Sequence, residues 1–165
     1  MVHKIYSCSL DELEHRENSL QFEKFDSNIA WDLGVFARNS AQSKYPGKPL
    51  VIDITLTGGH TLFRTALSRG TKADNDEWIR RKQNTVFRFG HSSFYIGQKL
   101  RLKNKTIEEG LYVSSKDYAA HGGSVPLRLK SFDGIIGALT ISGLAQEEDH
   151  LLCLEILESF LSESK

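Results

Sequence analysis

The sequence predicts an α+β fold, in which helices pack on an antiparallel sheet, rather than a doubly wound parallel sheet. The β-branched run 50–56 is followed by Gly58-Gly59, a two-residue hairpin signal, and by a return strand over 60–67. A second pair of strands is expected over 127–132 and 134–142, joined by a turn at Asp133-Gly134. Helical patterns precede, separate and follow these two hairpins, which favours a layered arrangement.

Two helices are expected before the first hairpin. Ser9 with Glu12 has the pattern of a capping box, which predicts a helix start there. A second helix is expected from Asp26 or Ser27 to the proline- and glycine-containing stretch 45–49. Its apolar residues fall on one face at helical spacing, namely Ile29, Leu33, Phe36 and Ala37.

The acidic run 74–77 predicts the start of a long helix that continues through 78–89, because acids stabilise the positive end of a helix. A shorter helix is expected over 92–102, and residues 103–117 read as a polar connection. A last helix is expected from about Gln146. Its apolar stripe consists of Leu151, Leu154, Leu157 and Leu161.

Composition narrows the class of protein. The chain has 165 residues, which favours a single domain over 1–165 with 1–25 as an N-terminal helical extension. Its 21 Lys and Arg balance 21 Asp and Glu, so nothing indicates a nucleic-acid binder. No apolar run reaches the about 20 residues of a membrane span, and no secretion signal is visible. Cys8 and Cys153 form no metal or redox spacing and are expected to be reduced thiols. We therefore expect a cytoplasmic protein.

Three stretches are candidates for a ligand site. Gly122 and Gly123 can let a ligand approach the backbone closely, although for the loop alone a plain turn before a strand is the favoured explanation. Ser142-Gly143 precedes the last helix, whose first N–H groups could bind an anion. The alternative is that side chains such as Ser142 and Glu147 satisfy that helix end.

The third stretch is a face of the long helix. Positions 75, 78, 82 and 85 share that face, and they are Asn75, Trp78, Lys82 and Thr85. A flat ligand could stack on Trp78 and pair its carboxylates with Arg81 or Lys82. The alternative is an exposed basic surface with Trp78 in a subunit contact.

The six histidines show no metal-ligand spacing, so no metal site is predicted and catalytic residues stay unknown. His121, His91 and His150 are the histidines near candidate loops. A hydrolase that uses Ser142 with His150 is a weaker third option.

Four stretches together resemble a known family. They are VIDITLTGGHTLFRTA at 51–66, TKADNDEWIRRKQNTVFRFGHSS at 71–93, YAAHGGSVPLRL at 118–129 and GIIGALTISGLAQEEDH at 134–150. The chain resembles the haem-degrading, HbpS-like and GlcG-like family. The resemblance implies a profilin-like or PAS-like fold with an antiparallel sheet of about five strands, homo-oligomers built from dimers, and haem as a candidate cofactor. The chain has no Cys-Pro pair, and no histidine stands out as an axial ligand.

Two hypotheses follow for function. The first is a small-molecule-binding protein whose ligand is flat or anionic, a tetrapyrrole or a carboxylate. Its candidate site residues are Asn75, Trp78, Arg81, Lys82, Thr85, His121, Gly122, Gly123, Ser142 and Gly143. The second is a non-catalytic oligomeric scaffold or adaptor for protein partners, such as chaperone or targeting machinery.

Overall fold

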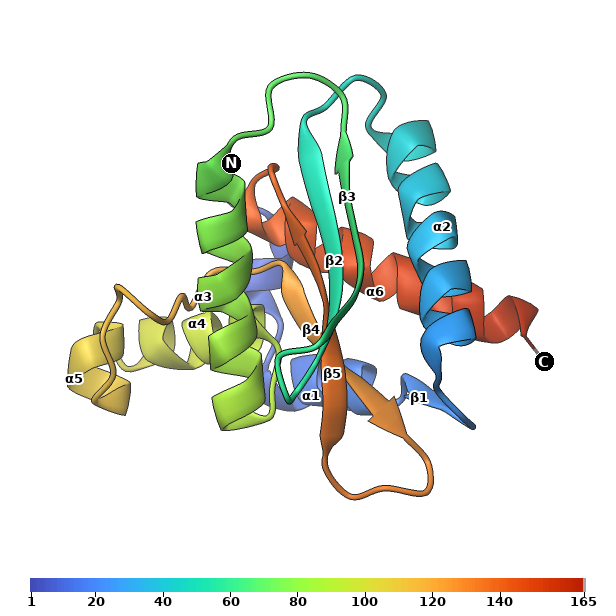
Figure 1. Ribbon diagram of the computed structural model, residues 1–165. Coiled ribbons are helices and arrows are strands. Elements are labelled where there is room, and N and C mark those ends of the chain that lie inside the picture. The colour runs from blue at the N-terminus through green and yellow to red at the C-terminus, as the bar shows by residue number, and fades with distance from the viewer. Residues whose placement is uncertain (165) are drawn as a thin grey trace.

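The computed structural model describes residues 1–164 and places seven helical segments around one five-stranded sheet (Figure 1). The strands are β1 (Gln21–Phe22), β2 (Leu50–Leu56), β3 (Thr61–Leu67), β4 (Ser124–Leu129) and β5 (Ile135–Ser142). The helices are η1 (Lys4–Ser7), α1 (Leu10–Asn18), α2 (Ser27–Lys44), α3 (Ala73–Phe89), α4 (Ser93–Leu102), α5 (Ile107–Leu111) and α6 (Gln146–Glu163). The strand order across the sheet is β1-β4-β5-β2-β3.

The predicted α+β class is confirmed, and both hairpins are present. β2 pairs with β3, and β4 pairs with β5, in antiparallel fashion. One detail differs, because β1 runs parallel to β4 and makes the sheet mixed. The strand β4 also begins at Ser124, earlier than expected. Pro126 is tolerated inside it because β1 pairs only with residues 128–129, so the missing N–H has no strand partner to serve.

The polar connection expected over 103–117 contains a short helix that was not predicted. The helix α5 occupies Ile107–Leu111 inside this stretch. Thr106 accepts a hydrogen bond from the N–H of Glu109, and the Glu109 side chain accepts one from the N–H of Thr106. This capping box has a sequence signature, a threonine followed three residues later by glutamate, so the helix start was readable from the chain.

The two faces of the sheet differ in polarity. Alternate residues of the two central strands, among them Ile52 and Ile141, point to one side and are fully buried against α2 and α6. α2 and α3 lie on opposite sides of the sheet (Figure 1). The face toward α3 instead carries Asp53, Thr140 and Ser142, all buried. A buried polar face requires partners for every donor and acceptor, and α3 supplies several of them.

Asp53 shows how this polar layer is satisfied. Its side chain is fully buried in β2. One oxygen accepts from Arg64 Nε at 2.8 Å, and the other accepts from Thr55 Oγ1 at 2.6 Å and from the amide of Gln83 on α3. The polar layer therefore fixes α3 on the sheet, which in turn positions the residues of α3 that face the candidate site.

The N-terminal residues pack on the rest of the chain. Ile5 and Leu13 are buried with Phe94 of α4, and Arg16 pairs with Glu158 of α6 at 2.6 Å. Within the predicted extension 1–25, residues 21–22 join the sheet as β1. No helix of residues 1–164 has the length and apolar character needed to cross a membrane.

One contact of α1 is sensitive to pH. Glu17 is buried, and its Oε2 accepts a hydrogen bond from the N–H of Ser92 at 3.1 Å. Burial raises the pKa of Glu17 to about 7. The unfolded chain releases this proton near the ordinary glutamate pKa, whereas the folded chain retains it to a higher pH. Stability is therefore lost as pH rises from the unfolded pKa through about 7.

We expect Glu17→Gln to remove this dependence while it keeps an acceptor for the Ser92 N–H. The unchanged protein should lose about 2 to 3 kcal/mol more than the variant between about pH 5 and about pH 8. Urea unfolding at both pH values measures the difference. Equal pH dependence in the two proteins would show that Glu17 is ionised throughout.

Candidate functional site

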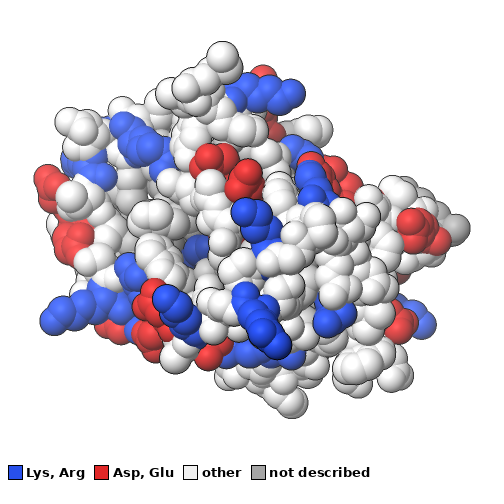
Figure 2. All heavy atoms as spheres, turned by 90° about the horizontal axis from the view of Figure 1, so that it is seen from above, with Lys and Arg blue, Asp and Glu red and all other residues white. Residues whose placement is uncertain are grey.

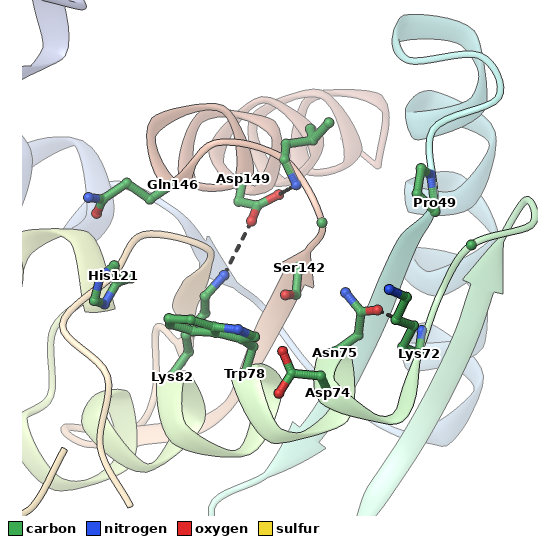
Figure 3. Close-up of a pocket in the computed structure, with 13 residues that line it drawn as sticks. Pro49, Lys72, Asp74, Asn75, Trp78, Lys82, His121, Ser142, Gln146 and Asp149 are labelled. Carbon is green, nitrogen blue, oxygen red and sulfur yellow. Dashed lines mark hydrogen bonds and ion pairs between the residues drawn. The ribbon is translucent and has the colours of Figure 1, made fainter. Parts of the chain in front are cut away.

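A hollow of about 510 Å³ lies where α3 begins, β5 ends and α6 begins. Figure 3 shows its side chains, which come from segments far apart in the sequence. The lining residues are Pro49, Gly70, Lys72, Asp74, Asn75, Trp78, Lys82, His121, Ser142, Gly143, Leu144, Gln146 and Asp149. We call it the α3–α6 hollow. Its size is typical of a site for a small organic molecule.

A buried ion pair forms part of its lining. Lys82 Nζ lies 3.2 Å from Asp149 Oδ2, and the two side chains are only 4% and 2% exposed. The ammonium also donates to the carbonyl of Ile141 at 3.3 Å, while Asp149 Oδ1 accepts from the N–H of Leu144 at 3.0 Å. Burial raises the pKa of Asp149 to about 6, against the opposing effect of Lys82. The pair joins α3 to the start of α6 (Figure 3).

The aromatic ring of Trp78 forms one wall. Its ring centre lies 5.9 Å from Lys82 Nζ and 5.1 Å from the His121 ring, which meets it edge-on. The guanidinium carbon of Arg81 lies 4.5 Å from the same ring centre. Partial burial of the His121 ring, followed by the charges of Lys82 and Arg81, lowers the pKa of His121. His121 is therefore a neutral imidazole at neutral pH, able to donate and to accept.

Three N–H groups around the start of α6 are already bonded to side chains. The N–H of Leu144 is bonded to Asp149, that of Ala145 to Glu148, and that of Gly122 to the Gln146 side chain. The expectation that Ser142 and Glu147 satisfy this end is wrong in its details. Glu147 instead accepts from the Tyr6 hydroxyl at 2.9 Å. These three N–H groups are therefore not available to a ligand, whereas no side chain caps the first N–H groups of α6 itself.

The charges of the hollow are mixed. Lys72 and Lys82 are balanced by Asp74 and Asp149. The surface of the molecule is mixed as well, with Lys and Arg interspersed among Asp and Glu in the view of Figure 2. A bound carboxylate can share the Lys82 ammonium with Asp149, whose raised pKa lets it take up a proton in exchange.

Six of the ten predicted site residues line the hollow: Asn75, Trp78, Lys82, His121, Ser142 and Gly143. The other four do not. Arg81 stacks on the Trp78 ring and lines a second hollow. Thr85 is fully buried, and its hydroxyl donates to the carbonyl of Ala119 at 2.9 Å.

Gly122 and Gly123 do not line the hollow but lie against residues that do. A Cβ at Gly122 would lie 2.3 Å from the carbonyl oxygen of Gln146, and one at Gly123 would lie 2.4 Å from that of Ile141. Their role is close packing of the backbone rather than ligand contact. They let the loop approach α6 and β5, which places Lys82 against Asp149.

The Ser142–His150 pair does not form. The ring of His150 is fully buried and stacks on Phe94 with ring centres 4.7 Å apart. Neither ring nitrogen has a hydrogen-bond partner within residues 1–164. Burial lowers the pKa of His150 to about 3, so this ring is a neutral core residue. Among those same residues, no three His, Cys, Asp or Glu side chains are grouped for a metal ion.

Comparison with known proteins gives the family. The model of the haem degrading protein HbpS-like family matches residues 25–158. The chain belongs to the HbpS-like family. It is 48% identical over 155 residues to the UPF0303 protein YBR137W of Saccharomyces cerevisiae, covering 94% of this chain and 86% of the relative.

Solved structures agree with this HbpS-like membership. The crystal structure of Ybr137w protein matches with a TM-score of 0.93 at 46% identity, over 98% of this chain and 93% of that one. A structure titled as a PduOC:Heme complex matches with a TM-score of 0.64 at 18% identity, over 84% and 93% of the two chains. The second likeness shows a shared fold.

Several lining residues of this HbpS-like chain were not predicted from sequence. Asp149, Lys72 and Gln146 were not among the candidate site residues. The pairing of residue 82 with residue 149 joins segments 67 positions apart. Only the tertiary fold brings these two charges together.

Proposed function

We propose that this HbpS-like protein binds a flat, carboxylate-bearing small molecule in the α3–α6 hollow. The observation that carries the proposal is the Trp78 ring beside the buried Lys82 ammonium, 5.9 Å from the ring centre. A flat ligand can stack on the indole while its carboxylate reaches Lys82 or the exposed Lys72. Asn75, Ser142 and Gln146 supply further polar groups around the same space.

Haem is one ligand of this chemical class, and the lining residues suit its macrocycle and its two carboxylates. Trp78 offers a face for the macrocycle, and Lys72 and Lys82 offer cations for its two carboxylates. His121 is the one histidine of the lining, and its lowered pKa keeps an imidazole nitrogen free to bind iron. Bound haem would supply iron-centred oxidation chemistry, while this chain would orient the group.

Titration with haem and with iron-free protoporphyrin IX tests this function and separates two contributions. We expect saturable absorbance changes with both ligands. Trp78→Ala and Lys82→Met should each weaken binding by about tenfold or more. His121→Ala should weaken the haem complex selectively if the imidazole binds iron. If His121→Ala weakens the binding of both ligands equally, His121 forms part of the wall and does not bind iron.

Arg80→Ala is the matched control. Arg80 lies on α3 between Trp78 and Lys82 in sequence, but its side chain is exposed and pairs with Glu77 and Asp117. This variant should bind both ligands as the unchanged protein does. Binding that survives in Trp78→Ala and Lys82→Met would refute a site in the α3–α6 hollow.

A second candidate function is that of an oligomeric scaffold for protein partners. Trp31 is 61% exposed and Val35 is 37% exposed on the outer side of α2, an unusual exposure for such large apolar side chains. We also propose homo-oligomers built from dimers, and a cytoplasmic location that suits the two free cysteines, Cys8 and Cys153. Light scattering of the unchanged protein and of Trp31→Ser tests whether this apolar surface supports assembly. An unchanged mass would remove α2 from the interface.

A further inference from the structure

A second hollow of about 230 Å³ adjoins the first at His121. It is bounded by α3, α4 and the segment that carries α5. Three basic side chains line it: Arg81 from α3, Arg101 from the end of α4, and Lys105 from the following turn. We call it the basic hollow. It is separate from the proposed carboxylate site, although His121 borders both.

The basic hollow is lined by cations, and the nearest opposing charges, Glu147 for Arg101 and Glu109 for Lys105, lie outside its lining. No carboxylate belongs to its lining within residues 1–164. Arg81 Nε donates to the carbonyl of Ser115 at 2.9 Å, and Arg101 Nε donates to the side-chain oxygen of Gln98 at 3.0 Å. Both acceptors are neutral, and neither guanidinium forms an ion pair in the described part of the chain.

Nearby carboxylates are held elsewhere. Glu108 accepts from the backbone N–H of Ser115, and Glu109 accepts from that of Thr106 at the start of α5. On the other side, Glu147 accepts from the Tyr6 hydroxyl. These contacts turn the acids toward local donors and leave the three cations facing the hollow. The α3–α6 hollow differs, since its two lysines face two aspartates.

Arg101 is held in place by its surroundings. Its guanidinium carbon lies 5.1 Å from the Tyr6 ring centre and 5.2 Å from that of Phe94. Partial burial lowers the pKa of Arg101, against the opposing effects of Tyr6 and Glu147. Gly97 lies directly against it, since a Cβ there would be 3.0 Å from Arg101 Nη1. The guanidinium is thus pre-positioned at the wall of the hollow.

We propose that the basic hollow binds a phosphate group through Arg81, Arg101 and Lys105. Two guanidinium groups offer planar pairs of N–H donors, which suit phosphate oxygens, and the lysine adds a mobile ammonium. The hollow has room for one phosphate group with part of whatever carries it. Free orthophosphate and a phosphomonoester of a small organic molecule share this chemistry.

His121 provides a readout of occupancy. Its pKa is lowered by partial burial and then by Lys82, Arg81 and Arg101. A phosphate dianion between the last two would offset their effect and raise the pKa of His121. The change can be followed by the imidazole proton resonance in NMR spectra, assigned with the His121→Gln variant.

The test titrates the full chain with sodium orthophosphate and with glycerol phosphate, against sodium chloride at equal ionic strength. We expect a saturable upward shift of the His121 pKa with phosphate and none with chloride. Arg101→Gln and Lys105→Gln should each weaken binding by about tenfold. Lys103→Gln is the matched control, because Lys103 is exposed in the same turn and outside the lining.

The outcomes separate the sources. Tighter binding of glycerol phosphate would assign an organic phosphate, and equal or weaker binding would assign orthophosphate. Lys105 is exposed, so its variant should fold normally even if Arg101→Gln does not. Two results would overturn the proposal. One is a His121 pKa shift with phosphate that is no larger than the shift with chloride. The other is phosphate binding that is unchanged in Lys105→Gln and Arg101→Gln. Neither result depends on ligand binding in the α3–α6 hollow.

Discussion

Lys82→Met is expected to lower the free energy of unfolding by about 3 to 5 kcal/mol near neutral pH. The change removes the ammonium and leaves the Asp149 carboxyl buried, with only the N–H of Leu144 as a donor. A buried carboxylate without a cation takes up a proton, and that proton is costly to hold at a pH far above the ordinary aspartate pKa.

The stability deficit of Lys82→Met should depend on pH, because the pKa of Asp149 differs between the folded and unfolded chains. In the unchanged protein the pKa of Asp149 is already raised to about 6. The contribution of Asp149 to the free energy of unfolding is therefore lost as pH rises from the ordinary aspartate pKa through about 6. Without Lys82 the pKa of Asp149 rises further, and the loss continues to higher pH. Urea unfolding at about pH 5 and about pH 8 should show a smaller deficit for Lys82→Met at the lower value.

A second substitution separates charge from packing. Asp149→Asn in the Lys82→Met background keeps an oxygen for the Leu144 N–H and removes the unpaired charge. The double variant should recover most of the lost stability and should have little pH dependence from this site. A double variant that is no more stable than Lys82→Met would contradict the assignment of the deficit to the buried carboxylate.

Gly123→Ala is the second substitution with a large expected effect, a loss of about 3 kcal/mol or more. Gly123 has a φ of 132°, which is disfavoured for a residue with a Cβ. A Cβ there would lie 2.4 Å from the Ile141 oxygen and 2.6 Å from Lys82 Nζ. The backbone oxygen cannot move easily, because the N–H of Ile141 is itself bonded to the Gly123 carbonyl at 2.7 Å.

Gly58→Ala serves as the control for this change. Gly58 lies in the β2–β3 turn, where a Cβ would meet no atom within 4 Å. Its stability should stay within about 0.5 kcal/mol of the unchanged protein. Thermal unfolding of both variants measures the contrast. A Gly123→Ala protein as stable as Gly58→Ala would mean that the loop at 122–123 is less tightly packed than the structure indicates.

Local signals in the sequence predicted most of the fold. The Ser9 capping box, the Asp26 cap and the Gly58-Gly59 turn each act within a few residues, and each appears in the structure. β1 was missed because two residues carry no periodicity. Its pairing with β4 depends on a contact between residues about a hundred positions apart.

The candidate site was harder to predict than the fold. The spacing of Asn75, Trp78 and Lys82 placed them on one helical face, and the structure brings that face to the hollow. The same spacing also selected Thr85, which lies deeper along α3 and is used in packing. Helical periodicity indicates which residues share a face, but not how far along the face the neighbouring elements leave space.

For the basic hollow, in contrast, no sequence pattern predicted that its cations lie together. Arg101 and Lys105 lie in a stretch without a motif, and Arg81 was predicted to line the site of Trp78 and Lys82. Their proximity arises from the packing of α4 and α5 beside α3. Scattered cations carry no sequence pattern that distinguishes a site from an ordinary solvated surface.

A flat carboxylate ligand is expected to stack on Trp78, and the chain allows a direct measurement of this contact. It contains two tryptophans, Trp31 and Trp78, so Trp31→Phe leaves Trp78 as the only indole emitter. We would titrate this variant with protoporphyrin IX and follow its emission. We expect saturable quenching, with an affinity that falls by about tenfold or more in Lys82→Met. Quenching no stronger than that of Trp31 in a Trp78→Phe protein would contradict it.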